Sequence, residues 1–296
     1  MEEATKRLAV VTGGNRGIGF SICKQLASNG IKVVLAARDE KKGLEAVEKL
    51  KELSLSGEVV FHQLDVTDSA SIGSFIEFIT NQFGKLDILV NNAAIVGAHI
   101  DGKALASLGV VVDPSQVDWT KIFSENSVLA EKSLRTNYYG TKEFTKALIP
   151  LLQCSTSPNI VNVSSSMGRL EIMSNGRPKE VLSDFQNLTE EKIDETLNGF
   201  LKDYKEGSLE SEGWPLANSA YIVSKVGLNA YTRIMANKYP CFCINAICPG
   251  YVKTDMNHGN GVLTSDEGGE PIVRLALLQD GAPSGLFFSR SEETSF

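Results

Sequence analysis

The sequence has few of the residues that form disulfide frameworks or metal sites. Its 296 residues include three histidines, which share no motif, and five cysteines, which are odd in number and scattered. The cysteines are Cys23, Cys154, Cys241, Cys243 and Cys248. This usage predicts buried free thiols in a reducing cytoplasm. Because nothing else in the sequence completes a site around Cys241-x-Cys243, we expect no bound metal.

Long apolar runs and basic tracts are also missing. No apolar run approaches the roughly 20 residues that span a bilayer, and the polar residues 1–6 lead directly into the first apolar run, so we expect neither a membrane span nor a secretory signal. The net charge is −7 and the pI is about 5.2, which disfavours a surface for nucleic acid. We therefore expect a cytoplasmic protein that binds neither nucleic acid nor a membrane.

Short apolar runs alternate with longer amphipathic stretches along the whole sequence. The predicted strands are Leu8–Val11, Val33–Leu35, Val59–Phe61, Ile88–Val90, Ile160–Val163, Ile244–Ile247 and Leu286–Phe288. The predicted helices are Ile18–Ser28, Asp39–Leu53, Ser69–Phe83, Val128–Leu152 and Ala220–Lys238. Runs that are apolar throughout are typical of strands buried on both faces. The pattern predicts an α/β fold, a doubly wound, parallel seven-stranded Rossmann sheet with helices on both faces, in one domain over residues 1–296.

A glycine-rich turn follows the first predicted strand. It reads Thr12-Gly13-Gly14-Asn15-Arg16-Gly17-Ile18-Gly19 and opens a predicted helix. Glycines in this context allow a tight turn and bring the backbone close to a pyrophosphate at the helix N-terminus. The spacing is G-x-x-x-G-x-G and not G-x-G-x-x-G, but the strand–turn–helix context predicts dinucleotide binding.

The residue after the second strand indicates which cofactor is bound. In an NAD-binding protein it is usually an acidic residue that hydrogen-bonds to the ribose. Here Arg38 occupies that place, and Arg16 in the glycine turn can reach the same group. Two guanidinium groups suit a 2′-phosphate, which favours NADPH/NADP+ as the cofactor. Asp39 is the alternative ribose acid, although we interpret it as a helix cap.

Further polar residues follow the third and fourth strands. The acid in Asp65-Val66 either bonds the adenine amino group or caps a turn. Side-chain amides at Asn91 and Asn92, followed by Ala93, are placed to tie strands together and to hold the cofactor. The carboxyl ends of the strands are where this fold binds ligands.

Tyr221 and Lys225 lie four residues apart, at the start of a predicted helix, and therefore on one helical face. A surface pair is the plain interpretation of this spacing. The functional interpretation is that the lysine charge lowers the tyrosine pKa, so that the phenol exchanges a proton with a carbonyl or an alcohol.

These motifs together resemble the short-chain dehydrogenase/reductase family over nearly the whole length. The matching residues are Thr12-Gly13-x3-Gly17-x-Gly19, Asp65, Asn91-Asn92-Ala93, Asn137, Ser165, Tyr221-x3-Lys225 and Pro249-Gly250. Within the family, the sequence more closely resembles the carbonyl-reductase branch, particularly the plant menthone/neomenthol and salutaridine reductases. This resemblance rests on the glycine turn with Arg38, on the segment Asn162–Ser166, and on the 55 residues between Ser165 and Tyr221.

The resemblance implies a catalytic tetrad of Asn137, Ser165, Tyr221 and Lys225. Ser165 and Tyr221 would donate to the oxygen on which charge grows, and Lys225 would also hold the nicotinamide ribose. Asn137 would order a water, bend its helix to satisfy a backbone group, or do both. Family spacing favours Ser165 over its neighbouring serines. The cofactor-binding set comprises Gly13, Asn15, Arg16, Gly17, Ile18, Gly19, Arg38, Asp65, Val66, Asn92, Ala93, Lys225, Pro249, Gly250, Val252 and Thr254.

Two segments are expected to adapt this fold to its task. An acidic, helix-like insertion at about 171–215, with a start at Thr189 and stops at Gly207 and Gly213, implies by resemblance a monomer. The stretch at about 251–267 predicts a substrate lid, which together with loop 95–119 would shape the pocket.

We expect NADPH-dependent, reversible reduction of a ketone to a secondary alcohol on a mostly apolar cyclic substrate, such as menthone or an alkaloid ketone. Two alternatives are an enone C=C reductase, which the retained Tyr221 disfavours, and a non-catalytic NADP-binding interaction protein.

Overall fold

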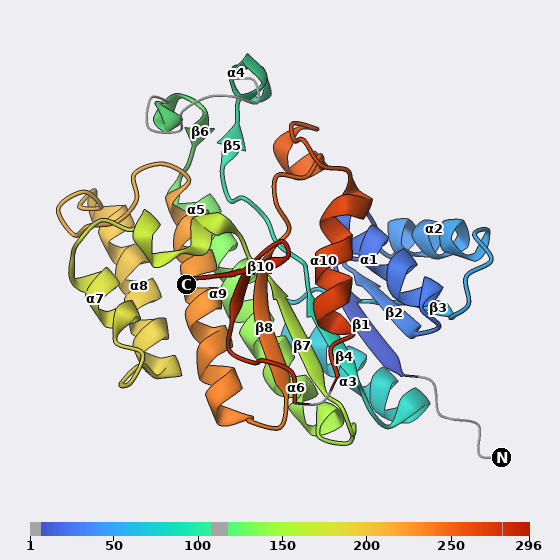
Figure 1. The fold of residues 1–296 in the computed structure, drawn as a ribbon. Helices are drawn as coiled ribbons and strands as arrows, with labels where there is room; N and C mark the ends of the chain where they lie inside the picture. Colours follow the sequence, from blue (N-terminus) through green and yellow to red (C-terminus); the bar gives the residue numbers. More distant parts are fainter. Residues whose placement is uncertain (1–6, 108–117, 280) are drawn as a thin grey trace.

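The fold is built on one large, mostly parallel sheet (Figure 1). The computed structural model describes residues 7–107, 118–279 and 281–296. The middle of the predicted substrate loop, 108–117, lies outside the described residues, as does the polar stretch 1–6. The sheet strands are β1 Leu8–Thr12, β2 Lys32–Ala37, β3 Val59–Gln63, β4 Ile88–Asn91, β7 Asn159–Val163, β8 Cys243–Cys248, β9 Phe287–Ser289 and β10 Glu292–Thr294.

The sheet order is β10-β9-β8-β7-β4-β1-β2-β3. The seven predicted strands are all present and pair in parallel, and the short β10 adds an antiparallel strand at the edge. The predicted α/β, doubly wound sheet is therefore confirmed, with one strand more than expected. β1 pairs with β2 on one side and with β4 on the other. The strands that follow β1 in the sequence are therefore added first on one side of it and then on the other. The point at which the side changes is where the fold leaves a crevice beyond the carboxyl ends of the strands.

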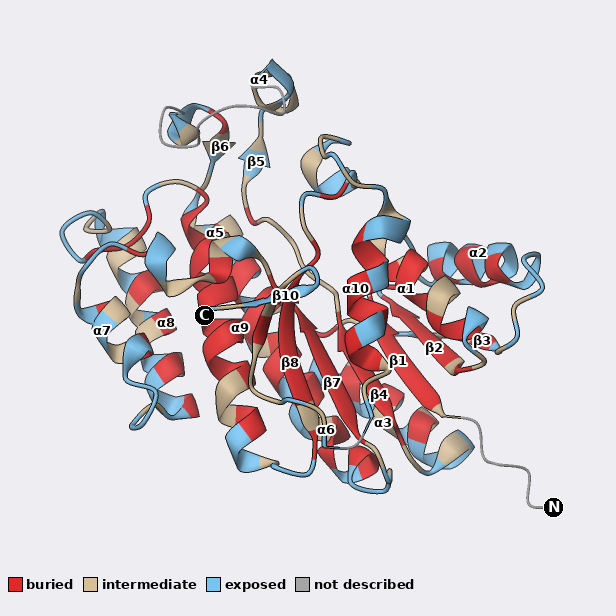
Figure 2. Cartoon of the chain, in the orientation of Figure 1, coloured by how far each residue is buried: buried red, intermediate tan, exposed pale blue. Residues whose placement is uncertain are grey.

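Burial on both faces explains the unbroken apolar runs. In β1, Leu8 and Val10 join the core cluster on one side of the sheet, whereas Ala9 and Val11 join the cluster on the other. Successive side chains of a strand point to opposite faces, so a strand covered on both faces favours apolar residues at most of its positions. Figure 2 shows the central strands buried along their length and the outer faces of the helices exposed.

Helices cover both faces of the sheet (Figure 1). One layer holds α1 Gly17–Ser28, α2 Glu40–Lys51 and α10 Ser265–Ala276. The other layer holds α3 Ser69–Phe83, α5 Ser127–Leu134, α6 Thr141–Leu152 and α9 Ser219–Lys238. The predicted helix Val128–Leu152 is interrupted between α5 and α6 by a π-helical turn, η3 Arg135–Gly140. Among the helices in the described ranges, none has the length and apolar character that crossing a membrane requires.

A small antiparallel hairpin stands above the carboxyl ends of the strands (Figure 1). It pairs β5 His99–Ile100 with β6 Phe123–Ser124. The short helix α4 Gly102–Ser107 follows β5, and the 3-10 turn η2 Trp119–Lys121 precedes β6. The hairpin therefore belongs to the segment in which the sequence predicts the substrate loop.

The predicted insertion forms helices α7 Arg177–Ser183 and α8 Glu190–Glu206, which lie outside α9 in Figure 1. Thr189 caps α8 by accepting from the Lys192 N–H, and Gly207 ends it with a φ of 73°, as the sequence predicts. The 3-10 turns η4 Ser166–Gly168 and η5 Leu170–Ile172 lead into the insertion. Apolar side chains of α8 join the same core cluster as α5, α6 and α9.

All five cysteines are free. The prediction that they are buried is wrong for Cys154 and Cys241, which are exposed, and Cys243 is half-buried. Cys23 and Cys248 are buried, one on a helix facing the sheet and the other at the end of β8. The burial of each cysteine depends on where the fold places it. A single cysteine forms no periodic pattern from which its burial could be predicted.

Candidate active site

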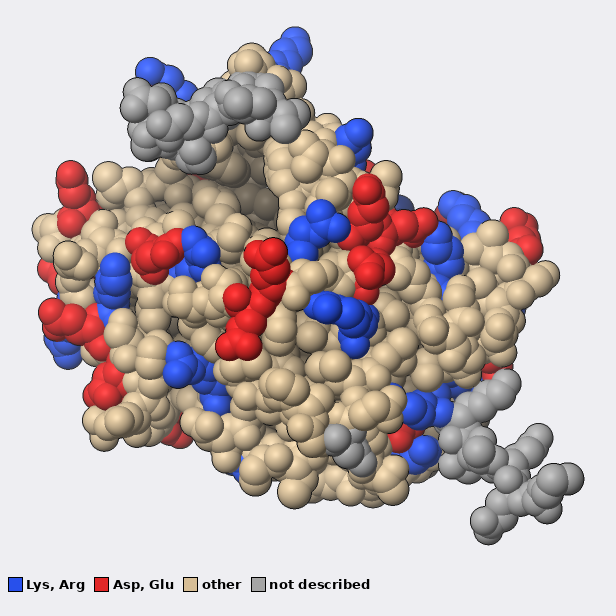
Figure 3. Space-filling view, in the orientation of Figure 1, with Lys and Arg blue, Asp and Glu red and all other residues tan. Residues whose placement is uncertain are grey.

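A pocket of about 500 Å³ lies at the carboxyl edge of the sheet. In the space-filling view, the surface is hollowed between the β5–β6 hairpin and the 3-10 turn η6 Asp255–Asn257 (Figure 3). Most of the predicted site residues line this pocket. They are Gly13, Asn15, Arg16, Gly17, Ile18, Gly19, Arg38, Asp65, Val66, Asn92, Ala93, Tyr221, Lys225, Pro249 and Thr254.

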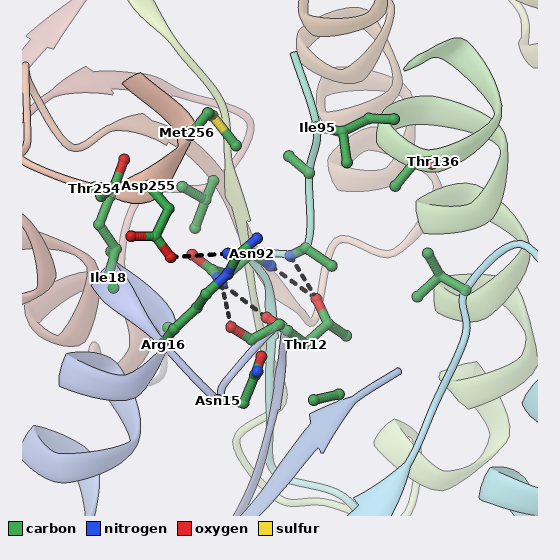
Figure 4. Close-up of a pocket in the computed structure, with 18 of the residues that line it drawn as sticks. Thr12, Asn15, Arg16, Ile18, Asn92, Ile95, Thr136, Thr254, Asp255 and Met256 are labelled. Carbon is green, nitrogen blue, oxygen red and sulfur yellow. Dashed lines mark hydrogen bonds and ion pairs between the residues drawn. The ribbon is translucent and has the colours of Figure 1, made fainter. Parts of the chain in front are cut away.

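The glycine turn forms a cradle that side chains would fill. Gly17 has a φ of 55°, in the left-handed region, at the first residue of α1. A Cβ at Gly19 would lie 2.3 Å from the Gly13 carbonyl oxygen and 2.6 Å from Nδ2 of Asn92. Asn92 donates from Nδ2 to the Thr12 carbonyl at 2.8 Å, which fastens the end of β4 to this turn (Figure 4). The turn therefore offers the close backbone approach that a pyrophosphate needs.

Arg16 and Arg38 line the same pocket, as their proposed common role requires. Arg16 forms an ion pair with Asp255, visible in Figure 4. The interpretation of Asp39 as a helix cap is confirmed, because its carboxylate accepts from the Lys42 N–H at 3.0 Å at the start of α2. That bond also lowers the pKa of Asp39.

The acid and the amides at the strand ends have structural partners. Oδ1 of Asp65 accepts from the Thr67 N–H and hydroxyl at 2.9 and 2.7 Å, so this residue caps a turn while it also lines the pocket. Asn91 donates to Oδ1 of Asn162 at 2.8 Å and thereby ties β4 to β7. The amides therefore tie neighbouring strands together, as predicted.

Three of the four catalytic candidates come from α9 and from the turn after β7. Tyr221 and Lys225 lie in the first two turns of α9, and Ser165 follows β7 at the start of η4. The Ser165 side chain interacts with the Tyr221 hydroxyl and lowers its pKa, while its Oγ accepts from the Met167 N–H at 3.2 Å. Lys225 is 2% exposed and donates from Nζ to the Val163 carbonyl at 2.8 Å. The structure thus brings the predicted serine, tyrosine and lysine together at one side of the pocket.

The expected lowering of the Tyr221 pKa by Lys225 is not observed. Burial raises the pKa of Tyr221 to about 12, and the interaction with Ser165 acts in the opposite direction without cancelling it. Burial also lowers the pKa of Lys225 to about 8. The lysine Nζ lies 5.8 Å from the centre of the tyrosine ring and bonds to a backbone carbonyl, so desolvation outweighs its charge. At neutral pH the tyrosine is therefore a protonated acid.

Asn137 lies in the π-helical turn η3 and is 1% exposed. Its Oδ1 accepts from the Ile95 N–H at 2.9 Å, and its Nδ2 donates to the Ile95 carbonyl at 2.8 Å and to Ser224 Oγ at 3.0 Å. The prediction that this asparagine satisfies a backbone group is therefore confirmed, and that group belongs to Ile95. It contacts the catalytic helix through Ser224.

Four predicted site residues are not among those that line the pocket, namely Asn137, Ser165, Gly250 and Val252. Ser165 and Asn137 reach the site through Tyr221 and Ser224. Val252 is 4% exposed and forms a bridge to Leu263, at the base of the predicted lid. A side chain buried there contacts protein, and only the backbone at this position remains as a candidate cofactor contact.

The pocket also includes residues that were not predicted individually, although five of them lie in the predicted loop 95–119 and lid 251–267. They are Thr12, Ala37, Leu64, Ala94, Ile95, Thr136, Val163, Ser164, Lys253, Asp255, Met256 and Ser265. Most of them are neighbours of predicted residues. Their position after a strand is the sequence feature from which a place in the pocket could have been predicted. Ser164 is 4% exposed, and its Oγ has no hydrogen-bond partner among the described residues. In the part of the chain that the structure describes, no cluster of three or more His, Cys, Asp or Glu is arranged to hold a metal ion.

Comparisons with known proteins point to one family. The profile of the short chain dehydrogenase family matches residues 7–176. (+)-Neomenthol dehydrogenase of Arabidopsis thaliana is 55% identical over 300 residues, with all of both chains covered. The solved structure of salutaridine reductase from Papaver somniferum superposes with a TM-score of 0.89 at 52% identity and covers 96% of this chain and 99% of that one. Carbonyl reductase [NADPH] 1 of Rattus norvegicus is 37% identical, with 95% of each chain covered.

Proposed function

The chain belongs to the short-chain dehydrogenase/reductase family, as a carbonyl-reductase-like oxidoreductase, and we propose that it reduces a ketone to a secondary alcohol with NADPH. The observation that carries this proposal is the meeting of Tyr221, buried Lys225 and the Ser165 side chain that acts on the Tyr221 hydroxyl, at the wall of the pocket that the glycine turn enters. When bound, the nicotinamide cofactor supplies the hydride. The residues of this chain supply the binding site, the orientation and the proton.

Tyr221 is the proton donor in this proposal. Its raised pKa keeps the phenol protonated at neutral pH, so it has a proton to deliver as negative charge grows on the carbonyl oxygen. Ser165 lies beside the same hydroxyl, lowers its pKa, and adds a second donor for that oxygen. Oriented donors of this type are each worth about 3 kcal/mol of barrier. Lys225, with a pKa of about 8, carries a charge at neutral pH and favours the phenolate left behind.

The proposed cofactor is NADPH because two arginines line the pocket. The acid that could instead bind the ribose of NADH, Asp39, caps a helix. Arg38 follows β2, Arg16 lies in the glycine turn, and Asp39 is engaged in capping α2. The cradle around Gly17 and Gly19 fits a pyrophosphate at the N-terminus of α1. A relative that is 37% identical carries NADPH in its name, which agrees with this choice.

The proposed substrate is a mostly apolar cyclic ketone. Relatives at 52–55% identity are named for neomenthol and salutaridine. In this chain, Ile95 and Met256 line the pocket, one on each flank in Figure 4. Apolar walls with a few convergent polar groups are typical of pockets for such ligands. Exchange with the corresponding alcohol runs through the same residues, so the reaction is reversible.

Reduction of an enone C=C bond and a non-catalytic binding role are less well supported. Both leave the Tyr221 and Ser165 pair without a task, although the two side chains are brought together from α9 and from the end of β7. A carbonyl oxygen gives both hydroxyls a common partner.

A monomer in a single domain is the proposed state of the chain. The insertion helix α8 packs over α9 and η3 and joins their core cluster. Its Asp194 accepts from Lys142 Nζ and from the Tyr138 hydroxyl at 2.9 Å, and its Glu190 pairs with Lys146. A helix seated this firmly on the helical face removes that face from contact with a second copy. The cytoplasmic location stays a prediction from cysteine usage.

The loss of NADPH absorbance with a panel of cyclic ketones, menthone included, tests the proposed function. NADH runs alongside, and Tyr221→Phe is the variant. We expect turnover with NADPH that the variant loses, while the NADPH dissociation constant stays the same. Turnover that survives in Tyr221→Phe overturns the assignment of the proton donor. Binding of NADPH without turnover of any ketone contradicts the proposed reaction.

A further inference from the structure

The segment that carries the predicted substrate loop is fastened to the catalytic helix α9 at both of its ends. At its start, Asn137 holds the N–H and the carbonyl of Ile95 and donates to Ser224 of α9 at 3.0 Å. At its finish, after β6, the carboxylate of Glu125 bonds to the first turn of α9. Glu125 belongs to none of the sequence motifs described above.

Glu125 acts as the N-terminal cap of a helix that begins 94 residues later. Its Oε2 accepts from the Ser219 N–H at 2.9 Å and from the Ser219 hydroxyl at 3.0 Å, and its Oε1 accepts from the Ala220 N–H at 3.1 Å. The residue in the usual capping position, Asn218, has a φ of 51° and makes no side-chain cap bond. Without Glu125, these N–H groups would lose the partner that the structure provides.

The capped turn is the one that holds the proton donor. Tyr221 follows Ala220 directly, so its backbone position depends on the turn that Glu125 closes. A carboxylate at this end of a helix also interacts favourably with the helix dipole. Glu125 itself is half-buried and lies between β6 and Asn126, which caps α5. One residue therefore joins the hairpin above the pocket, the start of α5 and the catalytic turn of α9.

We infer that Glu125 is a positioning residue for Tyr221, which sets the phenol relative to Ser165 and couples it to the segment that shapes the substrate pocket. This inference rests on the proposed function. In it, Glu125 does not touch the substrate and does not transfer a proton. It acts by holding the first turn of α9 in the place where the Tyr221 hydroxyl meets the carbonyl oxygen.

The test uses Glu125→Ala and Glu125→Gln in the full-length chain. Glutamine keeps one oxygen acceptor and removes the charge. Glu131→Ala, at an exposed acidic position on α5, is the matched control. NADPH titration first counts the functional binding sites in each preparation. The turnover number with menthone is then expressed per NADPH site, which separates positioning from a loss of folded protein.

We expect the turnover number per site to fall about 10- to 100-fold in Glu125→Ala and less in Glu125→Gln, since a small displacement of a catalytic group has effects of this size. The NADPH dissociation constant and the control variant should match the wild type. Fewer NADPH sites with an unchanged turnover number per site would show a structural role alone and overturn the inference. Tyr221→Phe in the same assay distinguishes the two proposals. Turnover that persists in this variant contradicts the proposed function, but it does not contradict the role of Glu125 as the cap of α9.

Discussion

Arg16 donates from Nη1 to Oδ2 of Asp255 at 2.8 Å, although 239 residues separate the two along the chain. The pair joins the glycine turn to η6, across the edge of the pocket (Figure 4). Both side chains are well exposed, at 68% and 74%. The arginine that we propose for the 2′-phosphate therefore already has an anionic partner in the protein.

Asp255→Asn should strengthen NADPH binding and leave NADH binding unchanged, because the carboxylate competes with the 2′-phosphate for Arg16. An exposed ion pair is worth about 1 kcal/mol at most, so the gain should not exceed roughly fivefold. Dissociation constants for both cofactors by fluorescence titration measure this effect, with Glu270→Gln on α10 as control. An equal change for NADPH and NADH would show that Asp255 does not act through the phosphate.

Arg38→Glu should weaken NADPH binding about 10- to 100-fold and NADH binding far less, since a charge-assisted bond to the phosphate is replaced by repulsion. The ratio of the two dissociation constants is the quantity to measure. Lys41→Glu makes the same charge change at an exposed position of α2. If Arg38→Glu weakens both cofactors alike, Arg38 does not read the 2′-phosphate.

Lys225 should make the folded protein more stable as the pH rises from 8 to 10. Burial lowers its pKa in the folded state to about 8, from 10.5 in the unfolded chain. Between these values the unfolded chain binds more protons, so the stabilisation is present above 10.5 and is lost as the pH falls through 8. The expected gain from pH 8 to pH 10 is about 2 kcal/mol.

The measurement for Lys225 is the free energy of unfolding by urea at both pH values, in the wild type and in Lys225→Met. Other groups titrate in both proteins, so the difference between them isolates the lysine. A pH dependence that is the same in the two proteins would mean that Lys225 has an ordinary pKa in the folded state.

Asp194→Asn should loosen the insertion. Lys142 is 7% exposed and would keep its buried charge without the partner carboxylate. We expect the free energy of unfolding to fall by about 2–3 kcal/mol. This is less than for a fully buried pair, because Asp194 is 32% exposed. Urea unfolding measures this loss. Lys142→Met combined with Asp194→Asn should recover most of it, and Glu195→Gln, at the next and exposed position, should have no effect. No recovery in the double variant would contradict the charge argument.

Local spacing explains which parts of the site the sequence predicts. Tyr221 and Lys225 share a helical face whatever surrounds them, because the period of the helix places residues four apart together. The glycine turn follows from the residues between β1 and α1, and the caps at Asp39 and Thr189 lie within three residues of the N–H groups they bind. Each of these predictions depends only on the chain close by.

The long-range contacts could not be predicted in this way. Glu125 reaches Ser219 and Arg16 reaches Asp255 only because parallel crossovers bring distant segments to one edge of the sheet. The charge of Lys225 also predicts the wrong sign for the shift in the Tyr221 pKa. Burial decides that sign, and burial is a property of the packed structure.

The sequence by itself determined the buried parallel strands, the cradle for a dinucleotide and the family of the chain, because these depend on periodicity, glycine geometry and short motifs. The tertiary structure alone decided the protonation of Tyr221, the partner of Arg16 and the cap on the catalytic helix. Desolvation and contacts between distant segments govern those features, and they are set only when the chain is folded.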